Sequence, residues 1–207
     1  KYKEKIMCGI IAAATEKSVG KLLVQGLYKM EYRGYDSAGV ALHQIDDIAH
    51  LRSLGKVKKL ESKMVKEKPK GKIGIAHTRW ATHGKPSEKN AHPHVSNNRV
   101  FIVHNGIIEN YVALKEQLIK KGYQFNSQTD SELIAHQLDF FLNQGSEMLD
   151  AMSLLKEKLE GAYAVAAIDL KNESHFYLMR NKSPLLLGQS DSGMFAASDP
   201  CLLYTSP

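Results

Sequence analysis

Short apolar segments occur in blocks along this chain, and their arrangement restricts the fold more than any other sequence feature. Compact apolar runs predict strands over 9–14, 38–43, 48–52, 73–77 and 100–104. Four further runs, over 163–170, 175–179, 185–188 and 194–198, follow a block of helical pattern. Strands in runs and helices in runs, joined by short turns, favour an α+β fold with largely antiparallel sheets.

Helices are predicted where apolar residues return every three or four positions. Val19, Leu23 and Met30 share one face of a helix over 19–30. Three more helices are predicted over 112–121, 129–142 and 147–160. The middle one is expected to begin with a capping box, because Thr129 precedes Glu132 by three positions.

Length and composition indicate one ordinary globular domain. The chain has 207 residues, of which 43% are hydrophobic and 24% charged. No apolar run approaches the ~20 residues of a membrane span, so no membrane partner is expected. The two cysteines, Cys8 and Cys201, form no disulfide framework, and no signal peptide is recognisable. A reducing cytoplasm is the predicted location.

Lysines gather in one stretch of the chain. Residues 56–72 hold eight lysines and two glutamates, a difference equal to the whole formal net charge of +6. Val57, Leu60 and Met64 recur there at helical spacing, which predicts a solvated amphipathic helix. A nucleic-acid surface is the alternative, but no aromatic side chains interleave the lysines, so no nucleic-acid partner is expected.

A methionine directly before a cysteine, Met7-Cys8, stands ahead of the first predicted strand. If Met7 is removed as an initiator, Cys8 carries both a thiol and a free α-amine with a pKa of ~7.7–8. A nucleophile and a base on one residue suit acyl transfer. The alternative is a buried cysteine at the start of a strand. Residues 1–6 are expected to be an extension upstream of the natural start, or a short propeptide.

Six motifs spread over most of the chain carry a resemblance to a known family. They are MCGII at 7–11, EYRGYDSAG at 31–39, GIAHTRWATHG at 74–84, NAHPHV at 90–95, VHNGIIEN at 103–110 and QTDSE at 128–132. Together they resemble the glutaminase domain of the glutamine–fructose-6-phosphate aminotransferases, which are class II glutamine amidotransferases. The resemblance implies the N-terminal-nucleophile hydrolase fold, an αββα four-layer sandwich. It spans roughly 7–200, so the domain is expected to be truncated at its C-terminus and 201–207 to be a non-native tail.

The resemblance also implies substrate-binding residues. Arg79 matches the arginine that grips the α-carboxylate of glutamine, a task that suits its bidentate fork. Thr82 and His83 match residues that help it. Asp130 matches the residue that binds the α-amino group, although an aspartate beside a helix start is also a common cap.

Asn105 and Gly106 match the oxyanion hole, supplying a side-chain NH2 and a backbone N–H. Cys8 would attack the side-chain amide of glutamine, and water would hydrolyse the resulting thioester. Arg33 is expected to support the nucleophile's end of the site. Trp80 matches a tryptophan on a mobile loop between the glutamine site and the ammonia path. Ammonia would pass to fructose 6-phosphate in an isomerase half that this chain lacks, and the full-length protein is expected to be a homo-oligomer.

Several alternatives remain at this point. The spacing of the five histidines at 77, 83, 92, 94 and 104 fits no zinc pattern, so neither metal nor cofactor is expected. Other class II amidotransferases, such as the purine-pathway enzyme or asparagine synthetase, share MCGI, but HTRWATHG favours the sugar enzyme. If Cys8 is not N-terminal, the chain is instead an inactive glutamine-binding module.

Overall fold

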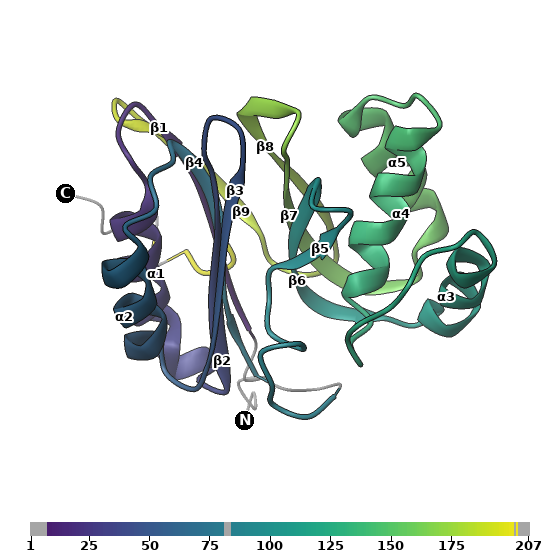
Figure 1. Cartoon of the computed structure of the whole chain (residues 1–207), viewed down its shortest axis with the longest axis horizontal. Coiled ribbons are helices and arrows are strands. Elements are labelled where there is room, and N and C mark those ends of the chain that lie inside the picture. The colour runs from purple at the N-terminus through teal and green to yellow at the C-terminus, as the bar shows by residue number, and fades with distance from the viewer. Residues whose placement is uncertain (1–7, 81–83, 201, 203–207) are drawn as a thin grey trace.

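Two antiparallel sheets face each other in the centre of the molecule (Figure 1), and the computed structural model describes residues 8–80, 84–200 and 202. The first sheet contains β1 (Gly9–Thr15), β2 (Ser37–His43), β3 (Ile48–Leu54), β4 (Ile73–Arg79), β9 (Leu186–Ser190) and β10 (Gly193–Ala197), in the order β3-β2-β4-β1-β10-β9. The second contains β5 (His94–Ser96), β6 (Val100–Ile108), β7 (Gly161–Asp169) and β8 (Asn172–Asn181), in chain order.

Helices cover the outer face of each sheet. α1 (Gly20–Met30) and α2 (Val57–Glu67) pack on the first sheet, and a short 3-10 helix, η1 (Glu31–Arg33), follows α1. α3 (Tyr111–Lys120), α4 (Glu132–Asn143) and α5 (Met148–Lys158) lie over the second sheet. The expected α+β class and αββα layering are therefore confirmed.

Strand alternation explains the layers, because successive side chains of a strand point to opposite faces. On β1, Ile10 belongs to the core between the sheets, whereas Ile11 belongs to the core under α1. On β4, Ile75 faces the space between the sheets and Ala76 faces the helices. The same parity continues to the strand ends, where the polar residues lie.

Some predicted boundaries were wrong. β4 continues to Arg79 and β6 continues to Ile108, each beyond the predicted end. The short strand β5 was not predicted at all. The capping box is also absent: α4 has Ser131 as its N-cap and no side-chain capping bond. The Glu132 carboxylate instead accepts hydrogen bonds from the backbone of Asn126 and Ser127.

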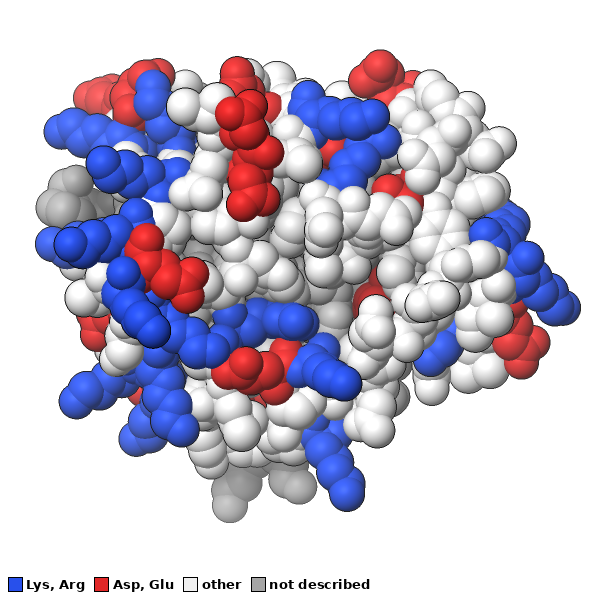
Figure 2. Space-filling model, viewed as in Figure 1, with Lys and Arg blue, Asp and Glu red and all other residues white. Residues whose placement is uncertain are grey.

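The lysine-rich segment forms α2 as predicted, with Val57 and Leu60 buried against the first sheet. Figure 2 shows basic side chains gathered on the α1–α2 side of the molecule. Among the described residues, no helix is both long and apolar enough to span a lipid bilayer.

Candidate active site

Strand parity brings polar side chains together at one end of the space between the sheets. β1 and β4 are antiparallel neighbours with Gly9 opposite Thr78, so Cys8 lies beside the end of β4. His77 and Arg79 share the inward parity of Ile75. On β6, Asn105 continues the inward face of Phe101 and Val103. The start of β1, the end of β4 and the second half of β6 therefore meet.

The Cys8 thiol is held by the backbone of Trp80. Trp80 N–H donates to Sγ over 3.2 Å, and Sγ lies 3.5 Å from the Trp80 carbonyl oxygen. Burial raises the pKa of the thiol, the Trp80 backbone lowers it, and Asp36 and Arg79 act in opposite directions. Since the net shift is upward, the sulfur is a thiol at neutral pH and needs a base to become a nucleophile.

Asn105 and Gly106 lie within β6 rather than at its end, opposite Ala164 and Tyr163 of β7. Asn105 Nδ2 donates to the Cys8 carbonyl oxygen over 2.8 Å. Gly106 has φ of +123°, and a Cβ there would collide with the carbonyl oxygen of Ala162. The conformation and the close approach both require glycine at this position.

Arg79 is a buried cation at the end of β4, with only 3% of its surface exposed. Its Nη1 lies 3.9 Å from Asp36 Oδ1, and its Nη2 donates to the Gly84 carbonyl oxygen over 3.3 Å. A buried guanidinium needs compensating negative charge. Asp36 supplies part of it, and an anionic ligand group would supply more.

Asp130 approaches from the loop before α4. It is 4% exposed, and its Oδ2 accepts a hydrogen bond from the Ile108 backbone N–H over 2.8 Å. The aspartate therefore fastens the α4 start to the end of β6 rather than capping the helix. Asp130 and Cys8 also line the same pocket. The other residues that line this pocket are Arg79, Trp80, His92, His104, Gly106, Thr129 and Ser131.

Comparison with known proteins shows the family to which the chain belongs. Residues 77–204, more than half of the chain, match the family described as glutamine amidotransferase domain. The chain belongs to that family. This amidotransferase domain is 46% identical, over 198 residues, to the glutamine–fructose-6-phosphate aminotransferase (isomerizing) of Vibrio parahaemolyticus, and 47% identical over 201 residues to that of Haemophilus influenzae.

These alignments cover 95% and 96% of the chain but only 32% and 33% of the two relatives, so the domain spans about a third of their length. Among solved structures, the glutamine phosphoribosylpyrophosphate amidotransferase from B. subtilis superposes with a TM-score of 0.81 at 25% identity. That match covers 94% of this chain and 42% of the other. The neighbours are class II amidotransferases with the N-terminal-nucleophile hydrolase fold, as the motifs indicated.

The structure places the remaining predicted residues of the amidotransferase domain at different distances from the pocket. Trp80 lines it and stacks edge-on against Tyr35, with ring centroids 5.4 Å apart. Arg33 does not line it: the guanidinium bonds Asp199 over 2.9 Å and the Ser198 carbonyl over 3.2 Å. Because Ser198 Oγ accepts from Ile10 N–H over 2.9 Å, Arg33 supports β1 indirectly. Thr82 and His83 lie outside the described residues.

Buried histidines surround the site, and motif matching gave them no role there. His92 lines the pocket, and its ring centroid lies 4.1 Å from that of His77 and 4.6 Å from that of His94. Burial lowers the pKa of His77 and His94 to about 3, so both rings are neutral at pH 7. The described residues contain no group of three or more side chains suited to a metal ion. The inward parity of β4 was the signal that would have placed His77.

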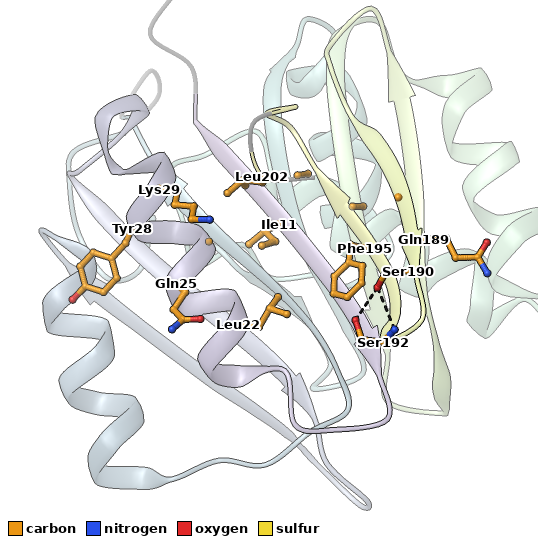
Figure 3. A pocket seen from close by; sticks show the side chains of 14 residues that line it. Ile11, Leu22, Gln25, Tyr28, Lys29, Gln189, Ser190, Ser192, Phe195 and Leu202 are labelled. Carbon is orange, nitrogen blue, oxygen red and sulfur yellow. Dashed lines mark hydrogen bonds between the residues drawn. The ribbon is translucent and has the colours of Figure 1, made fainter. Parts of the chain in front are cut away.

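A larger cavity of about 650 Å³ lies elsewhere, between α1 and the β9–β10 hairpin (Figure 3). Its walls include Ile11, Leu22 and Phe195, and among the residues that the structure describes Lys29 is the only charged one that lines it. Neither Cys8 nor any other predicted site residue in the described ranges lines it. Size therefore does not identify the reactive site of this amidotransferase domain, and the chemistry of the lining residues does.

Proposed function

We propose that this domain hydrolyses glutamine to glutamate and ammonia at Cys8. The observation that carries the proposal is the meeting of a thiol, a buried guanidinium, a buried carboxylate and a tightly constrained glycine around one pocket: Cys8, Arg79, Asp130 and Gly106. Membership of the glutamine amidotransferase domain family supports the choice of substrate.

Charge complementarity supports the orientation of glutamine. Its α-carboxylate would pair with Arg79, whose planar fork suits two parallel hydrogen bonds. Its α-ammonium would pair with Asp130, which is buried in the loop before α4 and still has carboxylate oxygen lone pairs available. Thr82 and His83 are proposed to assist at the carboxylate. The side-chain amide then points to Cys8.

The chemistry requires a base, because burial keeps the sulfur protonated. We propose that the α-amine of Cys8, free once residues 1–7 are removed, takes the thiol proton as sulfur bonds the amide carbon. The same proton goes to the departing ammonia as the C–N bond breaks. Water then cleaves the thioester, releasing glutamate and restoring the thiol.

Two donors are proposed to stabilise the tetrahedral oxyanion: Asn105 Nδ2 and the Gly106 backbone N–H. The first already lies 2.8 Å from the Cys8 carbonyl oxygen, next to the nucleophile. Each such donor typically lowers the barrier enough to raise kcat by ~10²–10³.

The pocket has about 20 Å³ of free volume in this conformation, room for about one water molecule. We therefore propose that its walls separate when glutamine enters. Trp80 lines the pocket and comes directly after Arg79, the last residue of β4. We propose that this side chain moves, because it is not held within a strand.

The acceptor of ammonia is proposed from the names of the relatives. Those proteins are glutamine–fructose-6-phosphate aminotransferases, and this chain spans about a third of their length. Residues 7–200 are accordingly proposed to be the glutaminase half of such an enzyme. Fructose 6-phosphate would bind in a separate isomerase half, and assembly into a homo-oligomer would belong to the longer protein. A reducing cytoplasm is proposed because Cys8 must stay a free thiol.

The covalent intermediate offers a direct experiment. Protein incubated with glutamine and quenched in acid should gain the mass of one glutamyl group, and peptide mapping should place it on Cys8. The Cys201→Ala variant is the matched control, because it removes the other cysteine of the chain and should label normally. Glutamine hydrolysis without a glutamyl group on Cys8, or labelling of Cys201, would contradict the proposal.

A further inference from the structure

We infer that His77 is a positioning residue, whose Nε2–H holds the Asn105 side-chain amide with its NH2 group toward Cys8. The inference rests on the proposed function, since Asn105 is an oxyanion donor only if Cys8 attacks an amide. It goes further by assigning a task to a histidine that the motifs left without one.

The geometry places one ring nitrogen between two oxygen atoms. His77 Nε2 lies 3.0 Å from Asn105 Oδ1 and 3.1 Å from the His104 carbonyl oxygen. A carbonyl oxygen only accepts hydrogen bonds, so Nε2 must carry the proton. The other ring nitrogen, Nδ1, is buried and has no hydrogen-bond partner among the described residues. A neutral ring with its single proton on Nε2 satisfies both contacts.

The opposite orientation of the Asn105 amide is excluded from both ends. If the amide were rotated by half a turn, Oδ1 would face the Cys8 carbonyl oxygen, which now accepts from Nδ2 over 2.8 Å. The NH2 group would then face Nε2, whose lone pair would also point at the His104 carbonyl oxygen. In the rotated orientation, each of these two contacts would bring like partial charges together in a buried site, where unpaired polar groups are energetically costly.

Burial keeps the His77 ring in this single-proton state. It is the main reason why the pKa of His77 falls to about 3. The hydrogen bonds to Asn105 and to the His104 carbonyl oppose this shift, and the charges of the His104 ring and Arg79 add to it. His92 packs on the ring with centroids 4.1 Å apart and a tilt of 38°. The imidazole therefore cannot turn without displacing a buried neighbour, and it offers Asn105 a fixed donor.

Steady-state kinetics provide the first test, on the form of the chain that hydrolyses glutamine. His77→Leu removes the donor and should lower kcat by about 10- to 100-fold, since small misplacements of catalytic groups have effects of that size. KM for glutamine should stay within about 3-fold, because substrate-binding residues are untouched. His77→Gln, whose amide can donate from a similar position, should recover most of kcat.

Two comparisons separate positioning from general damage. In an Asn105→Ala background, His77→Leu should lower kcat no further, because interacting groups give non-additive effects. His43→Leu is the matched control: His43 is a buried β2 histidine whose Nε2 lies 3.0 Å from the Leu170 carbonyl oxygen, outside the pocket. It should reduce stability while leaving kcat unchanged. Fully additive losses, or an equal kcat loss in His43→Leu, would overturn the inference.

An activity-independent measurement completes the test and does not need a variant to fold. Long-range ¹H–¹⁵N correlation spectra of the whole unmodified chain at pH 7 report which ring nitrogen of His77 carries the proton. The expected state is protonated Nε2 and bare Nδ1. A proton on Nδ1, or on both nitrogens, would overturn the inference even if glutamine is hydrolysed. If glutamine is hydrolysed neither by the chain that begins at Cys8 nor by the chain that retains residues 1–7, the proposed function fails. This spectrum still decides the tautomer in that case.

Discussion

The two ends of the space between the sheets are built on the same strands but filled with different side chains. At one end, Ile73, Ile75 and Phe101 belong to a dry core that joins β4 to β6. At the other end, the same inward parity continues with His77 and Arg79 on β4 and with Asn105 on β6. Cys8 adds the thiol from the start of β1.

The difference shows which end carries stability and which end carries chemistry. Burying apolar surface contributes about 25 cal/mol per Å², so the dry end holds the sheets together. The polar end contains a buried cation and several neutral buried histidines, all of which are costly to remove from water. Such a cluster destabilises the fold, but its polar groups can bind a ligand. Its position around Cys8 agrees with a role in binding.

The dry end should show the largest effect on folding. Phe101→Ala should lower the free energy of unfolding by about 3–5 kcal/mol, because it leaves a cavity between the sheets. Urea titration of the variant measures this change. Ile45→Ala, at a position that is 84% exposed, is the control and should stay within about 0.5 kcal/mol. A small loss in Phe101→Ala would show that the two ends do not differ as described.

The polar end should show its largest effect on substrate binding. Arg79→Met should remove the two charge-assisted hydrogen bonds proposed for the glutamine carboxylate, each worth about 1.5–3 kcal/mol, so KM should rise by about 10² or more. The matched control is Arg99→Met, since Arg99 pairs with Asp169 over 3.0 Å outside the pocket. That variant should lose stability and keep KM. Equal KM values in the two variants would show that Arg79 does not bind glutamine.

Acid should weaken the polar end selectively. The folded-state pKa values of His77 and His94 are about 3, below the unfolded value near 6.5, so the unfolded chain binds protons first. Their stabilising effect is complete above about pH 6.5 and is lost as pH falls, by about 1.4 kcal/mol per pH unit for each histidine. Burial also lowers the pKa of His50 to about 4 and that of His92 well below its usual value, so both rings add to the slope. Unfolding free energies measured from pH 6.5 to 5 should fall by the sum of these shares.

The same titration has an internal check. His77→Gln should reduce the slope by about one histidine's share, 1.4 kcal/mol per pH unit. Glu132 does not interfere in this range: burial opposes ionisation, but the nearby His136 ring and hydrogen bonds from Ser127 hold its pKa at about 2. Its contribution is lost only below about pH 4.5. An unchanged slope in His77→Gln would mean that this ring is not the neutral, buried group described.

Periodicity and motifs predicted the layers of the fold, because strand and helix patterns depend on local sequence. They failed where tertiary partners decide. β5 is short and polar, and it forms because β6 pairs with it. The predicted capping box is absent because Thr129 Oγ1 bonds the His94 Nε2 over 2.9 Å instead. His94 lies 35 positions from Thr129 in sequence. The partner of β5 follows closely, but three polar-flanked residues carry too little pattern to mark a strand.

The candidate site was partly predictable for the same reason. Motif matching selected Cys8, Arg79, Gly106 and Asp130, and the structure brings these four to one pocket. Their catalytic roles stay predictions. Arg33 supports β1 through Ser198 and Asp199, contacts that no local pattern could indicate. His77 was missed because its task depends on the orientation of a neighbouring amide across the two sheets.

The most direct test of the central claim compares two forms of the chain. One begins at Cys8 and has a free α-amine, and the other retains residues 1–7, so that the Cys8 nitrogen is an amide. Glutamate release from glutamine should be at least ~10²-fold faster in the first form, since loss of a general base typically lowers rates by ~10²–10⁴. If the chain that retains residues 1–7, verified by intact mass, hydrolyses glutamine equally fast, the α-amine of Cys8 is not the base and the account is wrong.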